Sequence, residues 1–252
     1  MNLNNPLKQA LADGKRQTGL WLTLGSVTAT EMAARAGFDW LLVDMEHSSL
    51  DFGDLLQHLR AAAAGSAEPV VRVPWNDAVI IKRVMDMGAR SLLIPYVQTV
   101  QEARQAVAAT RYPPHGVRGY SGMTRANDYA RITDYATRSS EATSLWLQVE
   151  SPEAAAVCGE IAAVDGVDGV FVGPNDLAAN MGFVGKAHLP EVQEAVRTAL
   201  HAIRGAGKPA GLLDYRPDNA KAWYEEGFSF IGVGGDTSLL SKAYTALLAN
   251  FK

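Results

Sequence analysis

The sequence predicts an α/β protein: one (β/α)8 TIM barrel that spans residues 1–252 as a single domain. Three observations predict this fold. The length of 252 residues is close to the roughly 250 residues of a minimal barrel of this type. Eight short apolar runs recur along the chain, and a longer helical pattern follows each of them. This alternation favours right-handed βα crossovers and parallel strands that helices cover on both faces.

The eight runs that we interpret as strands are nearly continuous apolar segments with few polar residues. Eight βα units favour a closed barrel over an open sheet. An open doubly wound sheet is the alternative, but no Gly-x-Gly-x-x-Gly motif follows the first run, which weakens a dinucleotide-binding version of it. In chain order the predicted strands are 19–24, 40–44, 69–73, 91–95, 144–150, 169–173, 209–213 and 230–234.

Helical patterns separate these strands, and the first four end at residues that stop helices. They end at Gly37, Gly65, Gly88 and Pro113, and a longer interruption follows over 112–140. The later helical patterns are 151–164, 189–207, 216–227 and 236–251.

Composition excludes several classes of protein. The net charge is −4, and no cluster of Lys and Arg is interleaved with aromatic residues, which argues against nucleic acid as a partner. A single cysteine, Cys158, excludes an internal disulfide and a cysteine-based zinc site, and it fits a reducing cytoplasm. The polar segment 1–17 lacks the apolar core of a signal peptide, and no apolar run is long enough to span a membrane. We therefore expect a cytoplasmic protein without a membrane partner.

Polar residues collect where the predicted strands end, which is the face that carries the active site in barrels of this type. Glu150 and Asp176 follow the neighbouring fifth and sixth strands, so their carboxylates are expected to converge. Two carboxylates, completed by water and substrate oxygens, suit a divalent cation such as Mg²⁺, Mn²⁺ or Co²⁺. The alternative for each residue is that it only caps the helix that follows.

Two further residues are candidates for catalysis. Arg72 lies in an otherwise apolar strand, and a buried arginine is costly unless it binds an anion or a carboxylate. The alternative for Arg72 is a structural ion pair. His47 follows the second strand and is placed to act as a general base. Asp86 lies near the end of a helical pattern, where a carboxylate is mildly unfavourable, so it is either functional or a solvated surface residue.

Position argues against other chemistries. No lysine lies at the end of a predicted strand, as a Schiff-base aldolase needs. Cys158 falls within a helical pattern, which disfavours a nucleophilic cysteine, and no Gly-x-Ser-x-Gly elbow follows a strand.

Several segments resemble the HpcH/HpaI family of class II pyruvate aldolases, over about 19–240. The most specific are RYPPHGVRG and, later in the chain, VFVGPNDL, with GFDWLLVDMEHSSLD, PVVRVPWND, MGARSLLIPYVQTVQEAR and LQVESPEA in support. The resemblance implies a (β/α)8 barrel whose last helix packs on a neighbouring subunit. It also implies a homohexamer built as a dimer of trimers.

The resemblance also implies roles for individual residues. Glu150 and Asp176 would hold the divalent metal, and pyruvate would chelate it through its carboxylate and keto oxygens. The backbone N–H groups of Asn175 and Asp176 would bind the pyruvate carboxylate. Arg72 would stabilise the enolate oxygen.

The remaining roles concern proton transfer and the walls of the pocket. His47, oriented by Asp86, would perform the acid–base step. Leu213 would border the aldehyde. The residues that would line the pyruvate pocket are Gln148, Gly173, Pro174, Asn175 and Asp176. Asp44 and Glu46 match acidic positions of the family near the subunit boundary.

The reaction expected from the resemblance is the reversible aldol cleavage of 4-hydroxy-2-oxo acids through the enolate of pyruvate or hydroxypyruvate. A lyase of the citryl-CoA or malyl-CoA type is an alternative on the same barrel, although no basic cluster is evident for the CoA phosphates. A barrel that binds an oxo acid without turnover is another. The presence of His47, Arg72, Glu150 and Asp176 together argues against it.

Overall fold

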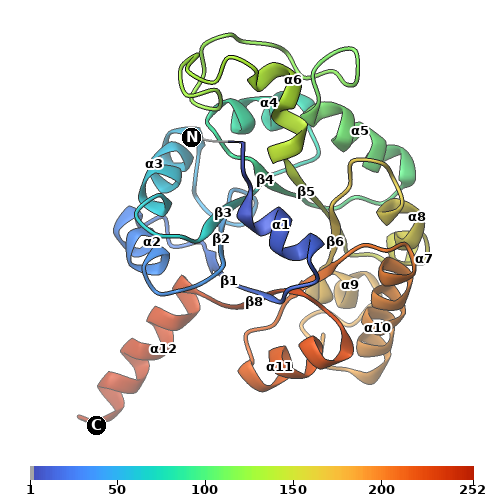
Figure 1. The fold of residues 1–252 in the computed structure, drawn as a ribbon. Coiled ribbons are helices and arrows are strands. Elements are labelled where there is room, and N and C mark those ends of the chain that lie inside the picture. Colours follow the sequence, from blue (N-terminus) through green and yellow to red (C-terminus); the bar gives the residue numbers. More distant parts are fainter. Residues whose placement is uncertain (1–2) are drawn as a thin grey trace.

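Eight parallel strands close into one barrel, in which each strand pairs with the next and β8 pairs with β1 (Figure 1). The computed structural model describes residues 3–252. The predicted closed (β/α)8 barrel is thus confirmed, and the open sheet is excluded. The strands are β1 (Gln17–Leu22), β2 (Trp40–Asp44), β3 (Glu68–Arg72), β4 (Ser91–Ile94), β5 (Ser144–Val149), β6 (Gly169–Val172), β7 (Ala210–Leu213) and β8 (Phe230–Gly235).

The helices cover the outside of the barrel (Figure 1). The predicted pattern at 151–164 forms two short helices rather than one, and α6 lies within the predicted interruption. The helices are α1 (Pro6–Ala12), α2 (Val27–Ala34), α3 (Phe52–Ala62), α4 (Ala78–Asp86), α5 (Val100–Thr110), α6 (Tyr135–Ala142), α7 (Pro152–Ala156), α8 (Cys158–Ala162), α9 (Pro174–Asn180), α10 (Pro190–Gly205), α11 (Pro217–Glu226) and α12 (Asp236–Ala249).

Large aromatic side chains fill the interior of the barrel. The rings of Trp40 and Trp146 stack on Phe230, with centroids 4.0 and 4.3 Å away. Glycines make room for them, because a Cβ on Gly19 would lie 2.1 Å from the Trp40 ring and one on Gly169 would lie 2.5 Å from the Trp146 ring. This interior is a packed core rather than a channel.

Helix α1, which the sequence analysis did not predict, closes the end of the barrel at which the strands begin (Figure 1). Leu7 and Leu11 on this helix are buried in the same cluster as the aromatic residues. Asn5 accepts a hydrogen bond from the Lys8 N–H at 3.1 Å and donates one to Ser91 Oγ at 2.9 Å. The helix is thereby capped and tied to β4, so this end of the barrel is sealed.

Helix α12 has a different environment from the other long helices. It extends away from the barrel (Figure 1), and none of its residues is buried. Its apolar residues Leu239, Tyr244, Leu247 and Leu248 are more than half exposed, and so is Phe251 beyond its end. Within residues 3–252, no helix combines the length and the apolar composition that crossing a membrane requires.

Cys158 begins α8 and has no exposed surface. Burial raises the pKa of its thiol to about 11. Since the thiolate is the reactive form, we expect iodoacetamide at pH 8 to leave Cys158 unmodified until the protein is denatured, as measured by intact mass. Equal labelling of the native and denatured protein would contradict this expectation.

Candidate active site

A cavity of about 300 Å³ lies at the end of the barrel where the strands finish. It is built mainly from residues at or just beyond the ends of β1, β2, β3, β6 and β7. The lining residues are Trp21, Thr23, Asp44, His47, Arg72, Gln148, Phe171, Gly173, Pro174, Asn175, Asp176, Leu213 and Tyr215.

Arg72 and Asp44 form a buried ion pair on neighbouring strands, where they occupy paired positions of β3 and β2. Arg72 Nε donates to Asp44 Oδ1 at 2.9 Å, and Nη2 donates to Oδ2. Trp21 Nε1 also donates to Asp44 Oδ2, at 3.2 Å. Burial opposes ionisation, but Arg72 outweighs it and holds the pKa of Asp44 below its usual value. The ion pair expected as one alternative for Arg72 is therefore present, and it fixes the guanidinium in the wall of the cavity.

Glu46 and His47 lie beside this ion pair. Arg72 Nη1 is 2.9 Å from Glu46 Oε2, and His47 Nε2 is 3.9 Å from the same oxygen. Burial raises the pKa of Glu46, while the positive charge of Arg72 works in the opposite direction. The His47 side chain is 66% exposed. His47 thus lies at the rim of the cavity, where it can exchange protons with solvent.

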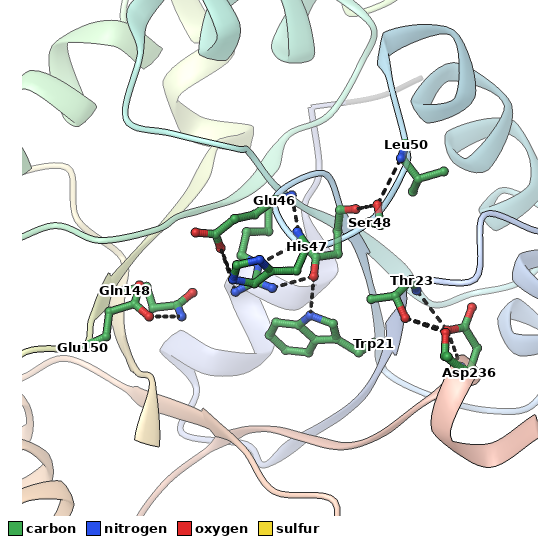
Figure 2. A network of polar contacts seen from close by, with 12 residues as sticks. Trp21, Thr23, Glu46, His47, Ser48, Leu50, Gln148, Glu150 and Asp236 are labelled. Atoms are coloured by element: carbon green, nitrogen blue, oxygen red, sulfur yellow. Dashed lines mark hydrogen bonds and ion pairs between the residues drawn. The ribbon is translucent and has the colours of Figure 1, made fainter. Parts of the chain in front are cut away.

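Glu150 is not among the residues that line the cavity, but it is buried against Gln148, which is, and it is held by two donors. Its Oε1 accepts the Tyr96 N–H at 2.9 Å. Its Oε2 accepts Gln148 Nε2 at 3.0 Å, which Figure 2 shows. Tyr96 adopts the left-handed conformation, with φ at 52°, which costs a non-glycine residue energy and here aims its N–H at Glu150. Burial, together with the negative charges of Asp176 and Glu46, raises the pKa of Glu150 to about 7.

The alternative in which Glu150 and Asp176 only cap helices is wrong. Ser151 caps α7, because its Oγ accepts the Ala154 N–H at 3.1 Å. Helix α9 begins after Gly173 without a side-chain cap. Asp176 lies exposed in its first turn. Neither carboxylate therefore caps a helix through a side-chain hydrogen bond.

These carboxylates fit a hard divalent cation. Glu150 and Asp176 repel one another electrostatically, and Gln148 Oε1 is buried with no hydrogen-bond partner. No group of three or more His, Cys, Asp or Glu residues within 3–252 is arranged to hold a metal ion. A cation bound by the two carboxylates would therefore complete its shell with water and ligand oxygens, as Mg²⁺ commonly does.

Gly173 leaves the space in which Glu150 and Gln148 meet. A Cβ at this position would lie 2.9 Å from Glu150 Oε2 and 3.1 Å from Gln148 Nε2. We therefore expect Gly173→Ala to displace the Glu150 carboxylate and to weaken Mg²⁺ binding, measured by isothermal titration calorimetry. Gly205→Ala is the matched control, because a Cβ there meets no atom within 4 Å. Unchanged affinity in a folded Gly173→Ala variant would show that Glu150 is not a ligand.

Asp86 and His47 do not meet within this chain. Asp86 ends α4, and its Oδ1 accepts Arg118 Nη2 at 2.7 Å. Arg118 is buried and stacks over Tyr112, with its guanidinium carbon 4.5 Å from the ring centroid. The motif RYPPHGVRG therefore contributes a buried arginine that binds the carboxylate at the end of α4.

Besides Asp44, which was expected only near the subunit boundary, four residues that line the cavity were not predicted as site residues: Trp21, Thr23, Phe171 and Tyr215. Trp21 and Thr23 lie at the end of the first strand, and Tyr215 lies two residues beyond β7. Their position at strand ends was a usable signal, but their apolar or neutral side chains gave no sign of chemistry.

Comparison with known proteins agrees with this geometry. The sequence profile of the HpcH/HpaI aldolase/citrate lyase family matches residues 17–243. A 4-hydroxy-2-oxo-heptane-1,7-dioate aldolase of Salmonella dublin is 47% identical over 250 residues, which cover 99% of this chain and 95% of that protein. An HpcH/HpaI aldolase/citrate lyase family protein from Burkholderia cenocepacia J2315 is 40% identical, with a TM-score of 0.95 and coverage of 98% and 99%. A citrate synthase is 26% identical, with a TM-score of 0.86 and coverage of 99% and 97%.

Proposed function

Because the chain belongs to the HpcH/HpaI aldolase/citrate lyase family, we propose that it is a divalent-metal-dependent aldolase that cleaves and forms 4-hydroxy-2-oxo acids. Membership makes the chain an enzyme of the carbon–carbon lyase class. The observation that carries the proposal is the pair of carboxylates, Glu150 and Asp176: Asp176 lines the same cavity as the fixed guanidinium of Arg72, and Glu150 is near enough to both to interact with them electrostatically. Mg²⁺, Mn²⁺ and Co²⁺ are the cations that suit these ligands.

The pyruvate half of the substrate is assigned to the inner part of the cavity. The N–H groups of Asn175 and Asp176 lie in the first turn of α9, where backbone donors have no partner within the helix. These donors are suited to bind the pyruvate carboxylate. Gln148 and Gly173 form the wall beside it, and Pro174 begins the helix. A bound divalent cation would polarise the keto group and neutralise part of the charge that develops there.

Cleavage breaks the bond between C3 and C4 of the substrate. The proton of the C4 hydroxyl leaves to His47 as the aldehyde forms, and the electron pair of the broken bond delocalises onto the C2 oxygen. Arg72 stabilises this enolate oxygen, and a proton added to C3 then completes pyruvate. Asp86 accepts a hydrogen bond from Arg118 of the same chain. We therefore propose that Asp86 orients His47 only in an assembled oligomer.

A turnover assay separates this function from its alternatives. The metal-loaded enzyme should release pyruvate from a 4-hydroxy-2-oxo acid, and it should exchange the methyl protons of pyruvate with solvent deuterium. Cleavage of citryl-CoA or malyl-CoA without either activity would favour the CoA-dependent lyase. Binding of pyruvate without exchange or cleavage would favour the non-catalytic barrel.

We also propose that the chain forms a homo-oligomer, a hexamer built as a dimer of trimers, in which α12 packs on a neighbouring subunit. Exposed apolar residues along a whole helix mark a surface that another protein covers. Asp236, which begins this helix, is fixed to the barrel because its Oδ1 accepts the Thr23 N–H at 2.9 Å (Figure 2). The helix therefore leaves the barrel in a defined direction.

Substitution of Leu247 and Phe251 with serine should dissociate this oligomer, because it removes apolar surface that the neighbour would bury. Light scattering coupled to size exclusion measures the mass. Lys242→Ser on the same helix is the control and should leave the mass unchanged. A wild-type protein that is a stable, active monomer at micromolar concentration would contradict the proposed assembly.

A further inference from the structure

A second cavity, of about 250 Å³, adjoins the first. The two cavities share four lining residues, Pro174, Asn175, Leu213 and Tyr215. The second cavity extends outward over the loop after β7, where Arg216 lies, and over the loop before α10, where His188 lies. A ligand bound in the first cavity can therefore extend past Leu213 into the second.

Arg216 is held in place by a buried carboxylate. Its Nε and Nη2 donate to the two oxygens of Asp214 at 3.0 and 3.1 Å. Asp214 is 8% exposed and also accepts Asn219 Nδ2 at 3.2 Å and Trp223 Nε1 at 3.4 Å. Burial opposes the charge, but these donors outweigh it and keep the pKa of Asp214 below its usual value. Asp214 is thus a positioning residue for a guanidinium that is fixed before any ligand binds.

The outer edge of the same guanidinium is free. The Arg216 side chain is 55% exposed, and its Nη1 has no hydrogen-bond partner among residues 3–252. His188 is exposed on the same cavity and likewise has no hydrogen bond or ion pair within the described part of the chain. A preorganised guanidinium with one open edge is suited to bind a carboxylate.

The inner cavity offers no cation for a second carboxylate. Arg72 is engaged by Asp44 and Glu46 on three of its nitrogens. Besides Arg72 and Asp44, the titratable side chains that line it are Asp176, His47 and Tyr215, and His47 is assigned to the acid–base step. A substrate with a carboxylate at each end therefore needs a cation beyond the inner cavity.

We propose that the second cavity binds a carboxylate at the far end of the aldehyde half of the substrate, with Arg216 as the residue that selects it. This inference rests on the proposed aldolase function. Cleavage of 4-hydroxy-2-oxo-heptane-1,7-dioate, for which similar proteins are named, between C3 and C4 leaves the second carboxylate on the aldehyde, succinic semialdehyde. Its methylene groups pass Leu213, and its carboxylate meets Arg216.

The experiment compares two aldehydes of equal chain length, succinic semialdehyde and butanal, in aldol addition to pyruvate. Arg216→Gln should lower kcat/KM for succinic semialdehyde by roughly 10- to 100-fold, mainly through KM, because one hydrogen bond to a charged group is lost. The value for butanal and the rate of deuterium exchange into pyruvate should stay close to wild type. Arg216→Lys should recover part of the loss, and Lys221→Gln, which removes an exposed cation on α11, is the matched control.

Each outcome decides one question. Equal losses with both aldehydes would mean that Arg216 only supports the loop, and no loss with either would mean that it does not contact the substrate; both results overturn the inference alone. A wild-type enzyme that neither exchanges the methyl protons of pyruvate nor adds either aldehyde would overturn the proposed function and the inference together.

Discussion

Arg72→Ala should lower turnover by roughly 10²–10³, the usual loss when one preorganised donor to a developing oxyanion is removed. The guanidinium lies fixed in the cavity wall by two hydrogen bonds to Asp44 and an ion pair with Glu46. Its interaction strengthens as charge moves onto the C2 oxygen, so the loss should appear in kcat more than in KM. Deuterium exchange into the methyl group of pyruvate, followed by NMR, measures enolate formation without an aldehyde.

Two further variants separate the chemical role of Arg72 from its structural one. Arg72→Ala leaves buried Asp44 without its counter-ion, which can itself destabilise the fold. Arg72→Ala combined with Asp44→Asn removes that buried charge and should stay folded yet remain slow. Arg72→Lys should also be slow, since a single ammonium does not reproduce the planar fork. Arg197→Ala, which breaks an ion pair with Glu226 on the outer helices, is the control. Exchange at the wild-type rate in the folded double variant would assign Arg72 to structure alone.

Removal of the divalent cation should have an effect of at least similar size. A chelator is expected to slow turnover by on the order of 10³, since a metal that polarises a carbonyl contributes several kcal/mol. Mg²⁺, Mn²⁺ or Co²⁺ should restore it. Glu150→Gln and Asp176→Asn each remove one anionic ligand and should weaken Mn²⁺ binding, which electron paramagnetic resonance measures independently of activity.

Asp218→Asn is the matched control for Asp176→Asn, because both aspartates lie exposed in the first turn of a helix that begins with proline. It should leave Mn²⁺ affinity unchanged. Full turnover by rigorously metal-free enzyme, or wild-type affinity in both ligand variants, would refute the assignment of this site.

The barrel was predictable because its strands are buried on both faces, which leaves an almost unbroken apolar run for each. The predicted segment 40–44 matches β2 at both ends, and the segment 209–213 differs from β7 by one residue. Helix α1 was missed because its seven residues are too few to repeat an apolar pattern, and the aromatic core of the barrel stabilises it through only two leucines, Leu7 and Leu11. The split between α7 and α8 at Val157 was equally invisible, since apolar residues continue across it.

The candidate site was predictable where a charged or amide side chain appears at the end of a strand, as at Arg72, Gln148 and Asp176, which all line one cavity. The bidentate partner of Arg72 was not identified, because Asp44 becomes its neighbour only through the register of β2 and β3. The strained amide of Tyr96 that holds Glu150 also escaped prediction, since a positive φ at tyrosine has no signature in sequence.

The sealed end of the barrel has a consequence for the order in which substrates bind and products leave. Because α1 and the aromatic core fill the other end of the barrel, a ligand reaches the cavity from the end at which the strands finish. Pyruvate is proposed to bind beside Gln148 and Gly173, which are buried. Leu213 is partly exposed, and Arg216 is exposed to solvent. Two products that leave through the same end of the barrel leave one after the other. If the chain is the proposed aldolase, we therefore expect the aldehyde to leave before pyruvate and, in the direction of synthesis, pyruvate to bind before the aldehyde.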